Sequence, residues 1–149
     1  ANRRYIEMFG YKCTLQTDTE VITYIFDYLV RKRGLTLDEV AHVIAASFWS
    51  TIAEKDEESR RQETLLRRMF PSLLVTGPFS IILGYTGGLM ALGDRLKLRS
   101  MVCAEKGDVA YIASEESAIR VIEPSPDRVF SPMGGEPVLF ELYDKGGCD

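Results

Sequence analysis

The densest group of residues that could do chemistry is the run Thr-Asp-Thr-Glu at residues 17–20. At this spacing, the threonine and the glutamate can bind each other's backbone N–H groups in the capping box of a helix. Asp18 would then lie at the positive end of the helix dipole. Residues 36–39, Thr-Leu-Asp-Glu, have the same spacing, and nothing else about them suggests a site. The pattern alone therefore favours capping at both places.

Thiols and imidazole give little support for catalysis. Cys13, Cys103 and Cys148 are odd in number, widely spaced and without a Cys-x-x-Cys pair, which predicts ordinary thiols in a reduced, cytoplasmic protein. Cys13 and Cys103 have strand-like, half-apolar neighbours, typical of small buried residues. His42 is the single histidine, so a His-rich zinc site is not expected. It projects away from the apolar face of its helix and should be solvated. We expect no metal ion and no cofactor.

The remaining candidates are interpreted as structural. Asp94 and Arg95 favour an ion pair that fixes a strand end over a catalytic pair. The glycines of "LGYTGGL" and "MGGEP" are typical of turns, and no Gly-x-x-x-x-Gly-Lys-Ser/Thr phosphate loop occurs. Read from its residues alone, the chain has no visible catalytic set.

Composition indicates one ordinary domain. The chain has 149 residues, 46% of them hydrophobic, and a net charge of −4. This charge gives no support for nucleic acid or an anionic membrane as a partner. No apolar run approaches the roughly 20 residues of a membrane-spanning helix.

The order of elements predicts an α+β fold. Apolar spacing predicts helices over residues 20–33, 37–46 and about 53–69, the last as a solvated surface helix. After Pro71 the pattern changes to strands, with hairpin turns at "TGG" and "KGD". A short helix capped by Ser114 and a final strand follow. Helices first and antiparallel strands afterwards give the α+β class.

Three segments, taken in order, resemble a known family. They are "NRRYIEMFGYKCTLQTDTEV", "GPFSIILGYTGGLMALGDRLKLRSMV" and "GDVAYIASEESAIR". They look like the glutaminase domain of class II glutamine amidotransferases, and most like the amidotransferase part of glutamate synthase in its separately encoded archaeal or bacterial form. Each motif is weak alone; the ordered set, which covers nearly the whole chain, carries the resemblance.

The resemblance implies a fold and a binding residue. The fold would be the four-layer αββα sandwich of the N-terminal-nucleophile hydrolases, incomplete at its N-terminus. Residues 1–149 would be a single domain, the C-terminal portion of the glutaminase domain, with a helical insertion at about residues 34–70. Asp18 would match the aspartate that binds the α-amino group of L-glutamine.

The departures from the family concern catalysis. Its members begin with a cysteine whose α-amino group acts as the base for its own thiol. Ala1 stands first here, and the family's oxyanion Asn-Gly would lie upstream of it. Cys13 cannot replace the nucleophile, because it is internal and precedes "TDTE" on what looks like a strand. Ser100 stands where the family usually has proline. We therefore expect no catalytic residue in this chain and no glutaminase turnover from it alone.

The resemblance also implies partners. In the family, glutamine is hydrolysed through a thioester, and the ammonia passes to a synthase partner that aminates 2-oxoglutarate. Apolar positions such as Val109 would lack usual neighbours, so we expect self-association or pairing with the missing N-terminal segment. The alternative is a non-catalytic scaffold or interaction domain that keeps the amidotransferase fold.

Overall fold

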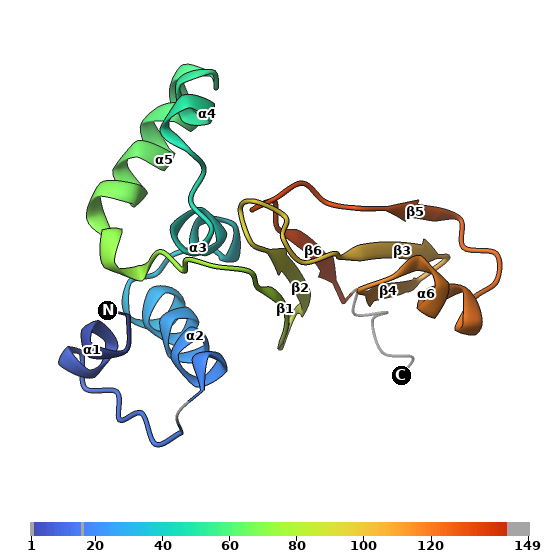
Figure 1. The fold of residues 1–149 in the computed structure, drawn as a ribbon, viewed down its shortest axis with the longest axis horizontal. Helices are drawn as coiled ribbons and strands as arrows, with labels where there is room; N and C mark the ends of the chain where they lie inside the picture. Colours follow the sequence, from blue (N-terminus) through green and yellow to red (C-terminus); the bar gives the residue numbers. More distant parts are fainter. Residues whose placement is uncertain (1, 16, 143–149) are drawn as a thin grey trace, which may run out of the picture. The chain divides into compact units, whose positions relative to one another are not determined.

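The computed structural model describes residues 2–15 and 17–142, so that Ala1 and Cys148 lie outside the described residues. The chain forms two compact units, residues 1–76 and 77–149 (Figure 1). The first is helical and the second is mostly strand. The predicted α+β class is therefore confirmed, whereas a single domain over residues 1–149 stays a prediction. No helix of the described residues is long and apolar enough to cross a membrane.

Apolar helix faces form the core of the first unit. Its fully buried side chains include Ile25, Leu29, Val40, Ile44 and Leu73. The elements are α1 (Asn2–Met8), α2 (Asp18–Asp27), the π-helical turn η1 (Tyr28–Lys32), α3 (Leu37–Ile44), α4 (Trp49–Ala53), α5 (Glu57–Met69) and the 3₁₀ turn η2 (Pro71–Leu73).

All three predicted helices of this unit are confirmed, the third with a later start. Residues 20–33 correspond to α2 and η1, and residues 37–46 to α3. The third, predicted over about residues 53–69, is α5, which begins later than predicted because the Asp56 side chain accepts a 3.0 Å bond from the Ser59 N–H and caps the helix there. The strand predicted around Cys13 is also wrong: residues 11–14 form no regular element. Helix α1 was not predicted.

Two antiparallel sheets form the second unit. In the first sheet the strand order is β1-β2-β6, and in the second it is β4-β3-β5. Both predicted hairpins are confirmed, whereas β5 was not predicted. Glu115, not the predicted Ser114, occupies the N-cap of α6 (Glu116–Ile122). The strands are β1 (Ser80–Tyr85), β2 (Gly88–Gly93), β3 (Val102–Lys106), β4 (Val109–Ala113), β5 (Arg128–Phe130) and β6 (Val138–Glu141).

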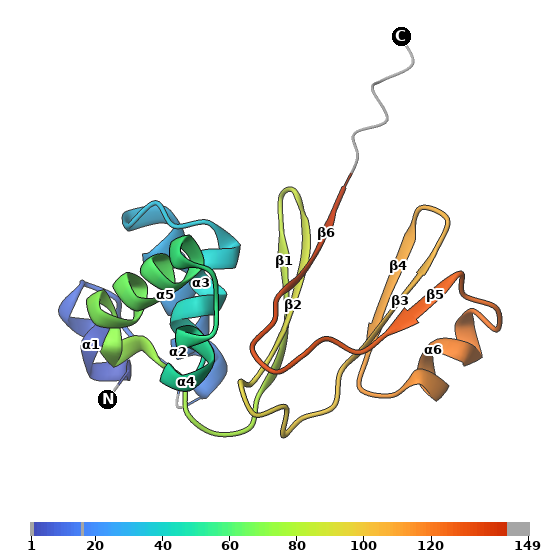
Figure 2. The same cartoon turned by 90° about the horizontal axis from the view of Figure 1, so that it is seen from above.

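The two sheets share one small core. Ala91 from β2 and Cys103 from β3 are fully buried in it. Partly buried side chains from β4, β5 and β6 pack around them, namely Ile112, Phe130, Val138 and Phe140. Helix α6 packs on β3 and β4, on the side of that sheet away from β1 and β2 (Figure 2). The second unit is thus two sheets with a helix outside one of them.

The turn between β1 and β2 contains a very close backbone approach. A Cβ atom added to Gly88 would lie 2.0 Å from the carbonyl oxygen of Phe140 on β6. At Gly87 the nearest neighbour would be the Tyr85 ring, at 3.0 Å. A ring can move, but a paired strand cannot, so glycine is required at residue 88.

Candidate functional site

Asp18 is the first residue of α2, where the helix leaves the irregular segment before it. Thr17 is the N-cap, and its hydroxyl accepts the Glu20 N–H at 3.3 Å. The Asp18 side chain is exposed and makes no hydrogen bond or ion pair within the described residues. An exposed carboxylate at a helix start is thus available for a ligand.

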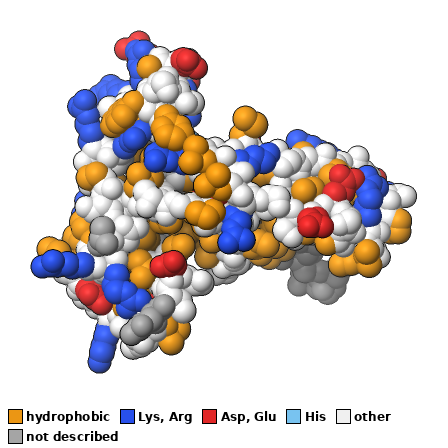
Figure 3. Space-filling model, viewed as in Figure 1, with side chains coloured by type: hydrophobic (Ala, Val, Ile, Leu, Met, Phe, Trp, Pro, Cys, Tyr) orange, Lys and Arg blue, Asp and Glu red, His pale blue; other side chains and the backbone are white. Residues whose placement is uncertain are grey.

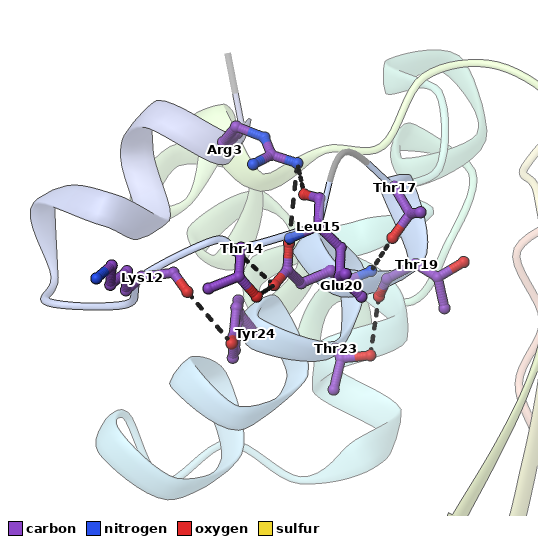
Figure 4. Close-up of polar contacts among 9 residues, drawn as sticks. All are labelled: Arg3, Lys12, Thr14, Leu15, Thr17, Thr19, Glu20, Thr23 and Tyr24. Carbon is purple, nitrogen blue, oxygen red and sulfur yellow. Dashed lines mark hydrogen bonds and ion pairs between the residues drawn. The ribbon is translucent and has the colours of Figure 1, made fainter.

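The capping box predicted at residues 17–20 forms only in part. The Glu20 carboxylate does not return to Thr17 among the contacts of the described residues; it accepts the N–H of Thr14 at 2.8 Å and of Leu15 at 2.9 Å (Figure 4). The box at residues 36–39 is complete, because Glu39 accepts the Thr36 N–H at 2.9 Å. Equal spacing in the sequence therefore gives different contacts.

Arg3 of α1 holds the same short segment from its other side. Its guanidinium donates a 2.6 Å hydrogen bond to the carbonyl of Leu15 and lies 3.9 Å from the Glu20 carboxylate (Figure 4). Leu15 is therefore bound through its N–H by Glu20 and through its carbonyl by Arg3. We name this group, Arg3 with Glu20 and the backbone of 14–15, the brace.

A polar stripe along α2 extends the brace. Glu20, Tyr24 and Asp27 lie at spacing i, i+4, i+7, on one helix face. The Tyr24 hydroxyl donates to the Lys12 carbonyl at 3.5 Å, and the Tyr11 hydroxyl donates to Asp27 at 2.6 Å. The segment before α2 is thus fixed at several points. This spacing was visible in the sequence and could have identified the stripe.

The pKa values of the stripe's carboxyl groups are lowered by the hydrogen bonds that they accept. Burial works to raise the pKa of Glu20, but the bonds from Thr14 and Leu15, together with Arg3, outweigh it and lower the pKa. The hydrogen bond from Tyr11 lowers the pKa of Asp27. Burial and the bond to Asp27 raise the pKa of Tyr11 to about 12. At neutral pH, both carboxylates are therefore charged acceptors.

The described cysteines are not activated. Burial raises the pKa of Cys103 to about 11, with a further contribution from Glu105. Desolvation raises the pKa of Cys13, and the nearby Glu20 adds to this. A lowered pKa activates a thiol as a nucleophile, and the surroundings of these two residues act in the opposite direction.

Asp94 is a structural carboxylate. It is 2% exposed and follows directly after β2. Burial works to raise its pKa, but the backbone N–H bonds outweigh it and lower the pKa. Asp94 therefore fixes the end of β2 through backbone amides, while the expected ion pair with Arg95 stays a prediction. The donors, at 3.0 to 3.3 Å, are the N–H groups of Phe79, Leu96, Leu98 and Arg99.

The prediction of a solvated His42 is wrong. Its side chain is 22% exposed and lies 3.5 Å from Glu63 of α5 and 3.6 Å from Asp38. Glu63 itself is buried and also pairs with Lys55. The packing of α5 against α3 covers most of the imidazole. The visible face of α4 and α5 carries basic and hydrophobic side chains, with acidic ones at its upper end (Figure 3). Among the described side chains, no group of three His, Cys, Asp or Glu could hold a metal ion.

An apolar groove opens between the two hairpin turns of the second unit. Leu89, Val109, Phe140 and Leu142 are among its lining residues. Val109 is 51% exposed and Leu89 is 39% exposed. The self-association or pairing that the resemblance implied stays a prediction.

Comparison with known proteins finds an archaeal relative of this chain. The chain is 46% identical over 144 residues to a protein of Archaeoglobus fulgidus described as an uncharacterized protein. The match covers 97% of this chain and 38% of the length of that protein. No protein-family model matches the chain. No solved structure matches it either.

Proposed function

We propose that residues 1–149 are part of a glutamine amidotransferase domain of the glutamate synthase type, in which Asp18 binds the α-amino group of L-glutamine. The observation that carries this proposal is the exposed Asp18 carboxylate, unpartnered within the described residues, on a helix start that neighbouring contacts fix. An ammonium group supplies the donors that such a carboxylate lacks, in a charge-assisted hydrogen bond.

The fold in this proposal is the four-layer αββα sandwich of the N-terminal-nucleophile hydrolases. Support comes from the second unit, in which two antiparallel sheets share a core and α6 covers one of them. That order corresponds to three of the four layers. The helices of residues 34–70 would be the insertion of the glutamate synthase subgroup.

The reaction is hydrolysis of glutamine to glutamate and ammonia, with the ammonia passed to a synthase partner in the cytoplasm. Asp18 binds and orients the substrate in this scheme. No residue of this chain is proposed as the nucleophile, a role that the family gives to an N-terminal cysteine; the raised pKa values of Cys13 and Cys103 agree with this.

The second candidate is a non-catalytic interaction domain with the same fold. The exposed apolar side chains of the groove beside Val109 favour it, because a partner or a second copy of the chain could cover them. Glutamine distinguishes the two candidates, since an interaction domain has no need to bind it.

Calorimetric titration of the full-length gene product with L-glutamine tests the proposal. Asp18→Asn should weaken binding about tenfold to a hundredfold, since a hydrogen bond to a charged group contributes about 1.5–3 kcal/mol. Asp38→Asn is the matched control, because it removes a carboxylate from the first turn of α3. Absence of saturable binding by the wild type, or equal affinity in Asp18→Asn and the wild type, would overturn the proposal.

A further inference from the structure

We propose that Glu20 is a positioning residue for Asp18, and that Arg3 couples α1 to the same site through the brace. This inference rests on the proposed function. It assigns Glu20 a role other than the helix capping that its sequence position predicts.

The contacts of Glu20 support this role. Both of its carboxylate oxygens bind the Thr14–Leu15 backbone, while its own N–H is bound by Thr17. Its side chain is only 9% exposed. Asp18 lies between the two anchoring points, two residues before Glu20 on the first turn of α2. The position of Asp18 is thereby fixed from both sides in the sequence.

Arg3 extends the coupling to another element. It binds Leu15 and approaches Glu20 from α1, which precedes the whole segment in the chain. Under the proposed function, the oxyanion donors would lie just before α1. The brace would then hold the element next to those donors in a fixed relation to the carboxylate that binds the substrate amine.

The start of α3 shows what Glu20 would do as a cap alone. Glu39 binds the Thr36 backbone in the complete box and also accepts a 3.2 Å bond from Gln62 of α5. It contributes to helix and interhelix contacts, without holding the segment before the cap. Glu39→Gln is therefore a matched control for Glu20→Gln: each removes one charge from an N3 glutamate.

The experiment compares Glu20→Gln and Glu39→Gln in the full-length gene product. Glutamine titration should show affinity about tenfold weaker in Glu20→Gln and unchanged in Glu39→Gln, because displacing a binding group affects binding directly. Arg3→Gln should show a smaller weakening of the same kind. Thermal unfolding recorded beside each titration should show that all three variants fold.

A second measurement makes the inference independent of glutamine. Hydrogen exchange at the amides of Thr14, Leu15 and residue 20 should accelerate in Glu20→Gln and not in Glu39→Gln. If Asp18→Asn weakens glutamine binding but Glu20→Gln does not, the proposed function stands and the positioning role is wrong. If the wild type binds no glutamine, the proposed function is wrong. Unchanged exchange at the amide of residue 20 in Glu20→Gln, which Thr17 binds in the wild type, would overturn the positioning role in either case.

Discussion

The starts of α2 and α3 share the pattern Thr-x-x-Glu, yet they use the glutamate differently. At α3 the Glu39 carboxylate closes the box on Thr36. At α2 the Glu20 carboxylate reaches past the cap to Thr14 and Leu15. The threonine caps both helices in the same way, but the backbone amides that the glutamate binds differ.

The difference teaches what a local pattern can and cannot decide. Thr-x-x-Glu fixes where a helix begins, because only the threonine-to-amide bond is common to both starts. The partner of the glutamate depends on which backbone amides lie within reach. At α2 those amides belong to a segment that the stripe of α2 and Arg3 also hold. The unpartnered carboxylate of Asp18 is found at the start with the additional contacts.

The largest loss of stability is expected at Asp94, a buried carboxylate that accepts hydrogen bonds from backbone amides. Asp94→Ala removes the acceptor of four backbone N–H groups from a buried position and should cost about 3 kcal/mol or more of stability in the second unit. Chemical denaturation followed by circular dichroism measures it. Asp94→Asn, which keeps one acceptor oxygen, should cost less. A loss below about 1 kcal/mol in Asp94→Ala would show that carboxylate–amide bonds contribute little here, and the comparison of α2 with α3 would lose its energetic basis.

An intermediate effect is expected from acid. The pKa values of Glu20 and Glu39 are both lowered in the folded chain. Their stabilising contribution is therefore fully present above the unfolded value of about 4.3 and is lost as pH falls through the lowered folded pKa. The wild type should lose stability below about pH 4, and Glu20→Gln and Glu39→Gln should each lose less over the same range.

Fluorescence of Trp49 measures this acid dependence in the first unit, because it is the single tryptophan of the sequence. Urea unfolding at pH 7, 4 and 3 gives the free energy of unfolding at each pH, and its change with pH is compared between the wild type and the variants. If both variants lose as much unfolding free energy between pH 7 and pH 3 as the wild type does, neither carboxylate is linked to folding, contrary to the contacts described for both helix starts.

The smallest effect is expected at the caps themselves. Thr17→Ala and Thr36→Ala each remove one acceptor for an N3 amide and should cost about 1 kcal/mol. Equal costs would confirm that the two starts share the same cap, which the comparison requires. A Thr17→Ala cost several times that of Thr36→Ala would show that the cap and the brace act together at α2. The same Trp49 unfolding signal reports both variants.

Much of the fold could be predicted because it depends on local patterns. The apolar spacing of α2 and α3 and the glycine turns of both hairpins were sufficient for those elements. Helix α1 and strand β5 were missed because each is short and is held by distant partners. Arg3 of α1 binds Leu15, and β5 pairs with β3 although β4 and α6 lie between them in the sequence. His42 was placed wrongly for the same reason, since α5 covers it.

The candidate site could be predicted only in part. Asp18 was reached through a resemblance, and its exposure at a helix start is a feature of the structure. The contacts of Glu20 with the segment before the helix were not predicted, because the capping box accounts for the same residue at the same spacing. One partner in those contacts, Thr14, precedes the motif and has no distinctive sequence signal.

The close approach of Gly88 to β6 limits how this protein can vary through evolution. Of the two adjacent glycines in the turn, Gly87 faces only a ring that can move, whereas Gly88 faces the backbone of Phe140. Substitutions in a population of related genes should therefore accumulate at residue 87 and be eliminated at residue 88. Two adjacent glycines would then differ in how often substitutions are retained, because only Gly88 lies against a paired strand.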